Sequence, residues 1–550
     1  NTEQKRAVAT ILSRCCGLAP YIIHGPPGTG KTKTVVEAAN QIIRQNFCFV
    51  QVDGKVQEQP LQMDANPVRI LICAPSDIAC DILCKRLSAT LKPSEMFRMN
   101  LPQRKVNEVV ELEVLPYCAV SSEGDFELHP CERVQSFKVV ICTCAAASLL
   151  LSFKASNGTF ALQEHFQNIF IDEAGQALEP ETLIPIAIGR VGNGRATIVM
   201  SGDHLQLQPA VRSPVALCFG FGTSMQERLL GLPLYQEKNT LSRFVFIRLL
   251  SNYRSHRQIL AFSSSYFYGN SLRAMCEQEK ANAFLTWEDM PVNRAGEPFP
   301  CIVYRVDGSE LLDIGSTSFY NNEEADKVVA VIQRLLSSKT MECRPHMIAV
   351  MAAYWQQVRL IRKKLRKVEL GSIRVGVVDD YQGQEAPITI LSCVLSETQK
   401  HLNEMVSPLS GLLGSPKRAN VALTRAMGLS IVIASSTFLR NDSCFGKLAK
   451  YCAENNALVG ASEGLDCAGS PKVGIVAEDR EEMHAPPKTQ LQGDDLVVPY
   501  DEEDSKTLPL FNFMEHFAVL GLNGMKEYAN TVTPVDAFYK EDMPFTGNSL

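Results

Sequence analysis

Short apolar runs that end in polar turns recur along the chain, with helical patterns between them. In the first half these runs predict buried strands, because they are short and rich in β-branched residues. The runs cover 21–24, 68–74, 139–143, 168–171 and 196–200. The stretch 33–43 is amphipathic and predicts a helix directly after the first strand. Strands that alternate with helices predict an α/β fold with a parallel sheet.

The second half repeats the pattern. Apolar runs over 301–306, 347–351 and 373–378 predict strands, and helical patterns cover 323–336 and 356–365. This is a second α/β layer structure. We therefore expect one domain over 1–240 and another over 241–453.

A glycine-rich turn follows the first predicted strand. It fits the phosphate-binding pattern GxxxxGK[ST] with Gly25, Pro26, Pro27, Gly28, Thr29, Gly30, Lys31 and Thr32. Such a loop points its N–H groups at phosphate oxygens, and the following helix favours the anion through its positive end. We expect Lys31 to reach the outer phosphates of ATP and Thr32 to hold Mg²⁺. The alternative is a chance turn, which would require the strand, the helix, Lys31 and Thr32 to coincide.

Two adjacent carboxylates, Asp172 and Glu173, end the apolar run 168–171. At that edge Asp172 is expected to bind the Mg²⁺ shell, and Glu173 to orient or deprotonate the attacking water. An isolated pair of this kind is usually solvated, so the preceding phosphate loop gives it meaning. After the next strand, Gln206 is placed to sense the γ-phosphate.

Five further residues are predicted to face the nucleotide. Gln4 can read the adenine edge through its amide, although a lone Gln is otherwise a surface residue. Tyr253 can stack on the base, and Arg254 can neutralise transition-state charge from across a cleft. Glu385 can accept from a ribose hydroxyl or hold an arginine. Arg425 is the better candidate for an arginine finger.

Composition narrows the setting. Length of 550 residues suits several domains, and eighteen cysteines without a CxxC pair are typical of reduced core residues. No apolar run is long enough to cross a membrane. The start lacks both Met and a signal peptide, which indicates a fragment. We expect a cytoplasmic protein, and cytoplasmic RNA granules are one location that fits this expectation. We expect no membrane partner.

Charge is unevenly spread. The net charge is −6, but residues 478–506 hold ten acids and three bases, a net of −7, so the rest sums to +1. A near-neutral body can still carry a basic groove for nucleic acid. The segment 454–550 is expected to be a disordered acidic tail that offers a docking site to protein partners, with a late apolar stretch at 508–522.

Two segments interrupt the strand and helix rhythm. Residues 50–67 are polar and predict a surface loop. Residues 92–137 contain scattered prolines with Arg98, Arg104 and Lys105, and predict a small insertion on the first domain. This insertion either contacts nucleic acid or is only a decorated surface loop.

The motifs GPPGTGKT, APSD, DEAGQ, GDHLQLQP, NYRSH, DDYQGQE and RANVALTRA, in this order, resemble superfamily 1B RNA helicases of the up-frameshift type. Within that group the chain is most similar to the Armitage and silencing-defective branch, which is Moloney leukaemia virus 10-like. The resemblance implies two tandem RecA-like P-loop domains, ATP and Mg²⁺ between them, and single-stranded RNA, or a duplex with an overhang, translocated 5′ to 3′. It also implies RNA contacts at Pro75, Ser76, Asp77 and Thr143.

Departures from the family pattern lie on the RNA side. Relatives usually have Asn at Asp77, Thr-Pro at Ala352 and Ala353, and Thr or Ser at Val377. These changes remove a polar partner or add a negative charge near phosphates, which predicts a competent ATPase with a weaker grip on RNA. Compensation by backbone amides and other cations is the alternative.

Three functions follow from these patterns. The first is an ATP-dependent RNA helicase or translocase in RNA silencing or surveillance. The second is a non-processive, ATP-gated RNA clamp. The third is a DNA helicase of the same superfamily, because the motifs mostly contact phosphates.

Overall fold

The computed structural model describes residues 1–44, 47–52, 55–60, 68–109, 111–190, 195–211, 213–313, 316, 318–395 and 415–460. Its α-helices are α1 (Thr2–Leu12), α2 (Lys31–Arg44), α3 (Asp77–Ser88), α4 (Cys131–Ser136), α5 (Glu179–Ile188), α6 (Pro214–Cys218), α7 (Met225–Leu230), α8 (Ser242–Val245), α9 (Arg257–Tyr268), α10 (Gln278–Asn282), α11 (Asn322–Leu336), α12 (Trp355–Lys367), α13 (Pro416–Leu423), α14 (Ser436–Asn441) and α15 (Ser443–Glu454).

Seven parallel strands form the first sheet. In spatial order they are β5 (Met96–Arg98), β6 (Val139–Thr143), β4 (Ile70–Ala74), β7 (Asn168–Ile171), β8 (Thr197–Gly202), β1 (Tyr21–His24) and β9 (Phe246–Arg248). The five strands predicted from apolar runs are confirmed, and all of their residues are buried. Burial on both faces is what a parallel sheet between helix layers requires.

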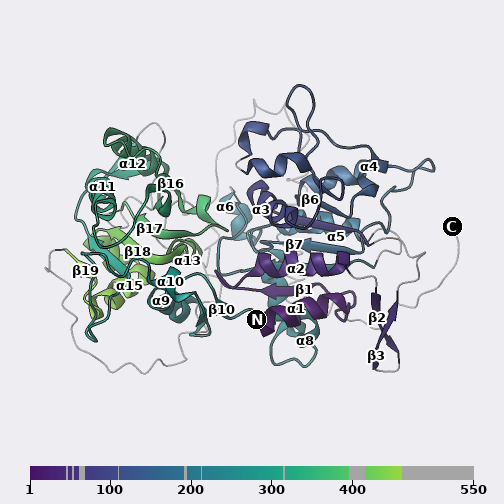
Figure 1. Ribbon diagram of the computed structural model, residues 1–550, viewed down its shortest axis with the longest axis horizontal. Coiled ribbons are helices and arrows are strands. Elements are labelled where there is room, and N and C mark those ends of the chain that lie inside the picture. Colours follow the sequence, from purple (N-terminus) through teal and green to yellow (C-terminus); the bar gives the residue numbers. More distant parts are fainter. Residues whose placement is uncertain are drawn as a thin grey trace, which may run out of the picture. The chain divides into compact units, whose positions relative to one another are not determined.

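Helices α1, α2 and α3 run along this sheet (Figure 1). Helix α2 buries Val35, Ala38 and Ile42 on one stripe, which confirms the helix predicted over 33–43. Because α2 starts at the carboxyl end of β1, its positive end points at the turn between them.

The segment 92–137 was predicted as an insertion, but its beginning belongs to the sheet itself. Strand β5 is the edge strand beside β6, and it buries Met96, Phe97 and Arg98 completely. The remainder contains short 3-10 helices over Val106–Glu108 and Leu112–Tyr117 before α4. The interpretation as a mere surface loop is therefore wrong for the part that completes the sheet.

The polar stretch 50–67 also differs from its prediction as a loop. An antiparallel hairpin pairs β2 (Phe47–Val52) with β3 (Lys55–Pro60). Paired backbone groups satisfy one another in such a hairpin, whatever the polarity of the side chains. Residues 61–67 lie outside the described part of the chain.

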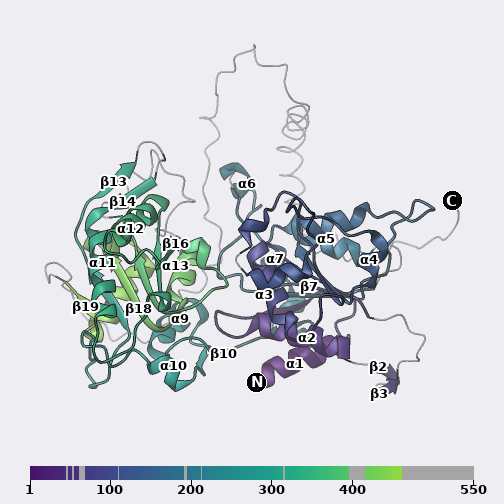
Figure 2. The same ribbon diagram turned by 45° about the horizontal axis from the view of Figure 1, so that its top comes forward.

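The second sheet has six parallel strands. Their spatial order is β16 (Arg374–Val377), β15 (Ile348–Ala352), β17 (Ala386–Ser392), β18 (Ala426–Ala434), β12 (Cys301–Arg305) and β19 (Leu458–Val459). Helices α11 and α12 pack against each other and against this sheet. The hairpin of β13 (Glu310–Asp313) and β14 (Ser318–Asn321) lies beside α12 (Figure 2).

The two sheets divide the chain slightly later than predicted. Strand β9 belongs to the first sheet although it follows residue 240, and β19 extends the second sheet beyond residue 453. The short strands β10 (Ser251–Asn252) and β11 (Arg273–Ala274) pair in parallel and follow β9 in the sequence, before the first strand of the second sheet. Of the tail predicted over 454–550, residues 454–460 are described and include β19, whereas 461–550, including 508–522, lie outside the described part of the chain. In the described part, no helix has the length and apolarity needed to span a membrane.

Candidate active site

The turn between β1 and α2 has the shape of a phosphate-binding loop. Gly28 and Gly30 adopt φ values of 71° and 83°, which side chains rarely tolerate. A Cβ on Gly28 would lie 2.6 Å from the Arg254 Cβ, so this backbone passes too close to its neighbour for any other residue. The Lys31 Nζ donates to the Gly25 carbonyl at 2.7 Å and is buried inside the loop. The loop therefore presents a lysine and backbone N–H groups together, as phosphate binding requires.

Thr32 and Asp172 meet across this loop although 140 positions separate them. The Thr32 hydroxyl donates to Asp172 Oδ2 at 2.9 Å. The other oxygen, Asp172 Oδ1, is buried and has no hydrogen-bond partner in the described structure. A buried carboxylate oxygen without a donor is costly unless something else satisfies it. The pair thus fits Mg²⁺, which prefers oxygen ligands from one or two carboxylates with substrate phosphates.

Glu173 follows Asp172 at the carboxyl end of β7 in an unusual backbone conformation, with φ at 52°. A non-glycine residue in this region stores strain and is often found at functional sites. Burial raises the pKa of Glu173, and the neighbouring Asp172 adds to this effect, while Lys31 opposes it. A carboxylate with a raised pKa accepts a proton more readily near neutral pH, which suits a general base.

Asp203 lies under the loop at the end of β8 and was not singled out from the sequence. Burial raises the pKa of Asp203. This effect is outweighed by His24, whose Nε2 lies 3.4 Å from Asp203 Oδ1, and by Lys31, so the pKa lies below its ordinary value. Asp203 Oδ2 accepts from Gln206 Nε2 at 2.8 Å and from the Tyr268 hydroxyl at 2.7 Å. The aspartate therefore fixes the orientation of the Gln206 amide.

The side chains of His24, Asp203 and His204 offer ligand atoms within 4.8 Å of one another. Two of these three ligands would be imidazoles, whereas Mg²⁺ prefers oxygen. The ligand atoms of this trio therefore suit Mg²⁺ poorly. The oxygen atoms of Thr32 and Asp172 fit the metal of the nucleotide better.

Arg425, which follows α13, reaches the first sheet. Its Nη2 donates to Gln206 Oε1 at 2.9 Å, and other guanidinium nitrogens donate to the Val421 and Gln384 carbonyls. Burial, with the nearby Arg254 adding to it, lowers the pKa of Arg425 to about 9. The guanidinium stays charged near neutral pH, and its hydrogen bonds hold it beside the Gln206 amide.

Arg254 is held from the second sheet's side. Its Nε donates to Glu385 Oε2 at 2.6 Å, and its Nη1 donates to the Thr424 carbonyl at 3.0 Å. Partial burial raises the pKa of Glu385, but the Arg254 guanidinium outweighs it and lowers the pKa. Of the two roles predicted for Glu385, the structure has it holding an arginine.

Asn252 is a residue that sequence reasoning missed. Its Nδ2 donates to the Pro27 carbonyl at 2.7 Å, and its Oδ1 accepts from the N–H groups of Arg254 and Ser255. It thus ties the phosphate loop to the segment that carries Arg254. Its position inside the NYRSH motif was the available signal.

Gln4 and Tyr253 lie at the outer side of the loop. The Gln4 Nε2 donates to the Thr29 carbonyl at 3.0 Å, and Asn1 Nδ2 donates to the Tyr253 hydroxyl at 2.8 Å. Tyr253 is 40% exposed. Their predicted roles toward adenine stay predictions.

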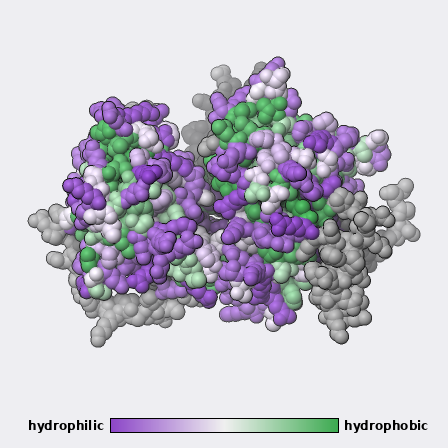
Figure 3. Space-filling model, in the orientation of Figure 1, coloured by the Kyte–Doolittle hydropathy of each residue, from purple (hydrophilic) through white to green (hydrophobic). Residues whose placement is uncertain are grey.

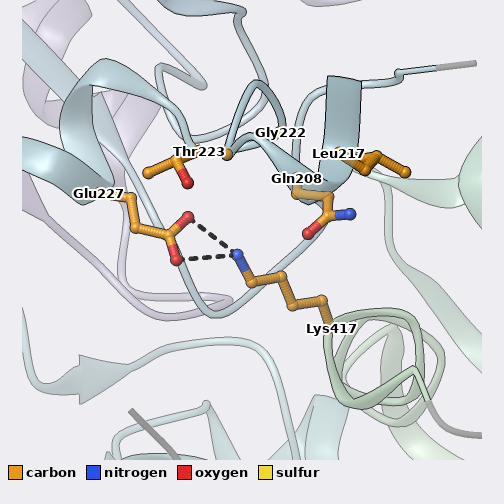
Figure 4. Close-up of a pocket in the computed structure, with 7 residues that line it drawn as sticks. Gln208, Leu217, Gly222, Thr223, Glu227 and Lys417 are labelled. Carbon is orange, nitrogen blue, oxygen red and sulfur yellow. Dashed lines mark hydrogen bonds and ion pairs between the residues drawn. The ribbon is translucent and has the colours of Figure 1, made fainter. Parts of the chain in front are cut away.

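A second link joins the segments that carry the two sheets. Lys417, at the start of α13, extends across a surface pocket and pairs with Glu227 of α7 at 2.9 Å (Figure 4). The pocket is lined by Gln208, Leu217, Gly220, Gly222, Thr223, Glu227 and Lys417. A part-exposed pair of this kind contributes about 0–1 kcal/mol, so it can open without great cost.

The residues predicted to touch RNA lie at the carboxyl edge of the first sheet. β4 and β6 are neighbours, and Ala74 pairs with Thr143 in their register, so the turn at Pro75 begins beside Thr143. The Ser76 hydroxyl caps α3, and the buried Thr143 hydroxyl accepts from the Ala146 N–H at 3.1 Å. Both hydroxyls already have a partner, and their RNA contacts stay predictions.

Asp77 does not present a free negative charge, contrary to the expectation drawn from its departure from the family. Arg98 Nη2 donates to Asp77 Oδ1 at 2.7 Å, and Arg104 lies 3.7 Å from the same oxygen. Both arginines also bind Asp81, so two anions face two cations. Since Arg98 is completely buried and Arg104 nearly so, the idea that they contact nucleic acid is wrong. They anchor α3 instead.

Two protein-family models, each described as an AAA domain, match the chain. One matches residues 1–119 and 130–214, and the other matches residues 223–437. The chain is 36% identical to the RNA helicase Mov10l1 of Homo sapiens over 469 residues, which is 84% of this chain and 35% of that protein. It is 33% identical to the putative helicase mov-10-B.1 of Danio rerio over 515 residues, 90% of this chain and 47% of that protein. It is 28% identical to the probable RNA helicase armi of Drosophila melanogaster over 492 residues, 84% of this chain and 39% of that protein.

The chain thus spans less than half the length of these curated relatives. Among solved structures, the Arterivirus nonstructural protein 10 helicase matches at 14% identity with a TM-score of 0.35, over 80% of this chain and 64% of that chain, which is too distant to inform on the fold. The two AAA-domain matches, however, cover every motif described above. The chain belongs to the up-frameshift-like superfamily 1 helicases, in the group of Mov10l1, MOV-10 and Armitage.

Proposed function

We propose that this chain is the motor of an ATP-dependent RNA helicase or translocase that moves 5′ to 3′ and acts in RNA silencing or surveillance. The observation that carries the proposal is the hydrogen bond from Arg425, beyond the second sheet's α13, to Gln206 at the end of the first sheet. An arginine delivered from a second unit to the phosphate loop of the first couples hydrolysis to relative motion of the two. The proposed domains are the two RecA-like units, divided at about residue 250.

The roles of the residues follow from their contacts. Lys31 would leave the Gly25 carbonyl to bind the outer phosphates, and Thr32 with Asp172 would hold Mg²⁺. When bound there, Mg²⁺ would neutralise charge on the phosphates. Glu173 accepts the proton of the attacking water, and Arg425 and Arg254 stabilise charge on the transferred phosphoryl group. Gln206, held by Asp203, positions the Arg425 side chain.

Nucleic acid is the proposed partner at the edge where the strands of both sheets end, since open parallel sheets bind ligands there. RNA with a single-stranded region is the proposed form. Docking of protein partners on the acidic tail and a location in the cytoplasm, including its RNA granules, belong to the same proposal. Sixteen cysteines of the described chain are free thiols, which supports a reducing setting.

A non-processive, ATP-gated RNA clamp is the second candidate. It is favoured by the apolar residues at the carboxyl edge of the second sheet, where Ala352 ends β15 and Val377 ends β16. Strand displacement measured beside ATP turnover separates the two, because unwinding at rates near turnover excludes the clamp. Matched RNA and DNA oligomers in competition test the sugar preference.

Steady-state ATP hydrolysis, with and without single-stranded RNA, tests the proposal. Strong stimulation by RNA, lost in Lys31→Ala, is the expected result. Hydrolysis that ignores RNA at every concentration would contradict a coupled motor.

A further inference from the structure

Helix α12 (Trp355–Lys367) carries a continuous basic face on the second unit. Its exposed residues are Trp355, Arg359, Arg362, Lys363, Arg366 and Lys367. They are spaced three or four residues apart and so form one stripe along the helix. The opposite side buries Gln357, Val358, Ile361 and Leu365. In the region of α12, at the top left of Figure 3, hydrophilic residues border a hydrophobic patch.

The stripe is electrostatically unfavourable for the isolated protein. Cations at Arg359, Arg362 and Lys363 repel one another and those one turn further on, since residues three and four apart are neighbours on a helix. The helix dipole favours cations only within the last turn, which accounts for Arg366 and Lys367 but not for the others. Such an arrangement is relieved by a polyanion.

Few acidic groups of the protein itself lie close to these cations. Among the described residues, no ion pair within 4.0 Å involves a cation of the stripe, whereas Lys364, on another side of the helix, pairs with Asp326. Hydrogen bonds from Ser316 and Gln356 lower the pKa of Asp313, and Arg359 of the stripe adds a smaller contribution in the same direction. Arg362 packs 5.5 Å from the centre of the Trp355 ring and donates to the Val375 carbonyl.

The stripe starts where a ligand of the second sheet is expected. Strand β15 ends at Ala352, and α12 begins directly after it with Trp355. Trp355 is 44% exposed at this edge. An exposed tryptophan followed by a row of cations combines a surface for stacking a base with a track for phosphates, the two parts of single-strand binding sites.

We propose that the exposed face of α12 is a nucleic-acid track of the second unit, on which Trp355 stacks with a base and the cations bind successive phosphates of RNA. The track is about 18 Å long at 1.5 Å per residue. It compensates for the polar groups missing at Ala352, Ala353 and Val377, so the second unit's grip on RNA is not weak. This inference rests on the proposed function.

The salt dependence of RNA affinity tests the track. The variant Arg359→Gln/Lys363→Gln/Arg366→Gln removes three charges. Because single strands give about 0.7 in the log–log slope per phosphate contact, the slope should fall by about 2. The matched control, Arg440→Gln/Lys447→Gln/Lys450→Gln, removes the same charge from α14 and α15 and should leave both slope and affinity close to those of the wild type.

Tryptophan 355 is tested separately. Trp355→Ala should weaken RNA binding about tenfold, and Trp355→Phe should restore most of it, because stacking needs an aromatic ring. Affinity for a fluorescent ATP analogue without RNA should be the same in all variants, and thermal unfolding should show that each is folded.

The outcomes are distinguishable. If the wild type binds RNA but the α12 triple variant behaves like its control, the track is overturned while the proposed function stands. If the wild type binds no RNA at any salt concentration, both fall. A poly-glutamate peptide that binds the stripe while RNA affinity is unaffected by the variant would assign this face to an acidic protein partner and overturn the proposal.

Discussion

Arg425 donates a hydrogen bond to Gln206 at 2.9 Å across 219 positions of sequence. Gln206 is itself held by Asp203, which also accepts from Tyr268 in α9. Asn420 of α13 completes the link by donating to Tyr268 and to the Leu205 carbonyl. A hydrogen-bond network thus positions the arginine. It joins residues that follow the first sheet's β8 to residues of α9 and α13.

We predict that Arg425→Ala lowers ATP turnover by on the order of 10³-fold, because the transition state loses a charge aimed at the phosphates. Gln206→Ala should cost less, since it removes only a partner that orients the guanidinium. The two substitutions together should cost less than the sum, as contacting residues are coupled. Turnover at saturating ATP and RNA for the four proteins checks this. Arg425→Lys is the charge-preserving control, and a normal rate in Arg425→Ala would exclude the role.

Glu173→Gln should retain ATP binding and lose about 10²- to 10⁴-fold in turnover, because an amide cannot accept the proton of water. The raised pKa of Glu173 also sets a pH dependence. The base must be ionised to act, so wild-type turnover should decline on acidification at a higher pH than an ordinary glutamate would give. A pH–rate profile checks this, with the ATP affinity measured in parallel. An identical acidic limb in the variant would assign that limb to another group.

Asp77→Asn should change RNA affinity little, because the carboxylate is already paired with Arg98 and Arg104. We expect a loss of about 1 kcal/mol in the free energy of unfolding, since Asn still accepts from Arg98. Asp81→Asn serves as the comparison and should cost roughly 3–5 kcal/mol, because it leaves two buried guanidinium groups short of their shared anion. RNA titrations and urea unfolding measure both. A large gain in RNA affinity in Asp77→Asn would restore the view that this charge repels phosphates.

Glu324 of α11 is buried, and burial raises its pKa to about 8. Its Oε2 accepts from the Ser392 hydroxyl and the Val394 N–H, while Oε1 has no partner among the described groups. Between its ordinary pKa and about 8 the folded protein holds a proton that the unfolded chain releases. Stability should therefore fall as pH rises through this window.

Glu324→Gln should remove that part of the pH dependence. The amide oxygen still accepts both hydrogen bonds, and no charge must be buried. We expect the variant to be more stable than the wild type at pH 8 and similar at pH 5. Urea midpoints at the two pH values check this. A variant destabilised equally at both would show that Glu324 acts through packing alone.

Much of the site was predictable from the sequence because parallel strands all end at one edge of their sheet. Any polar turn after an apolar run must then lie near the others, which is why the phosphate loop with Lys31, Asp172 with Glu173, and Gln206 were found as separate motifs and yet meet. The strands and main helices followed from the same patterning, since burial on both faces leaves little choice of residue.

What the sequence determined by itself is the chemistry: a phosphate loop, two carboxylates at a strand end and arginines in the second half, each recognisable because its residue types and local spacing are fixed by the task. Only the tertiary structure decided which groups neutralise each other. Asp77 appears as an added charge in the sequence, but Arg98 and Arg104 come from a segment that was predicted as a small insertion on the first domain. Long-range pairing of this kind depends on how the chain returns to the sheet, and no local pattern encodes it.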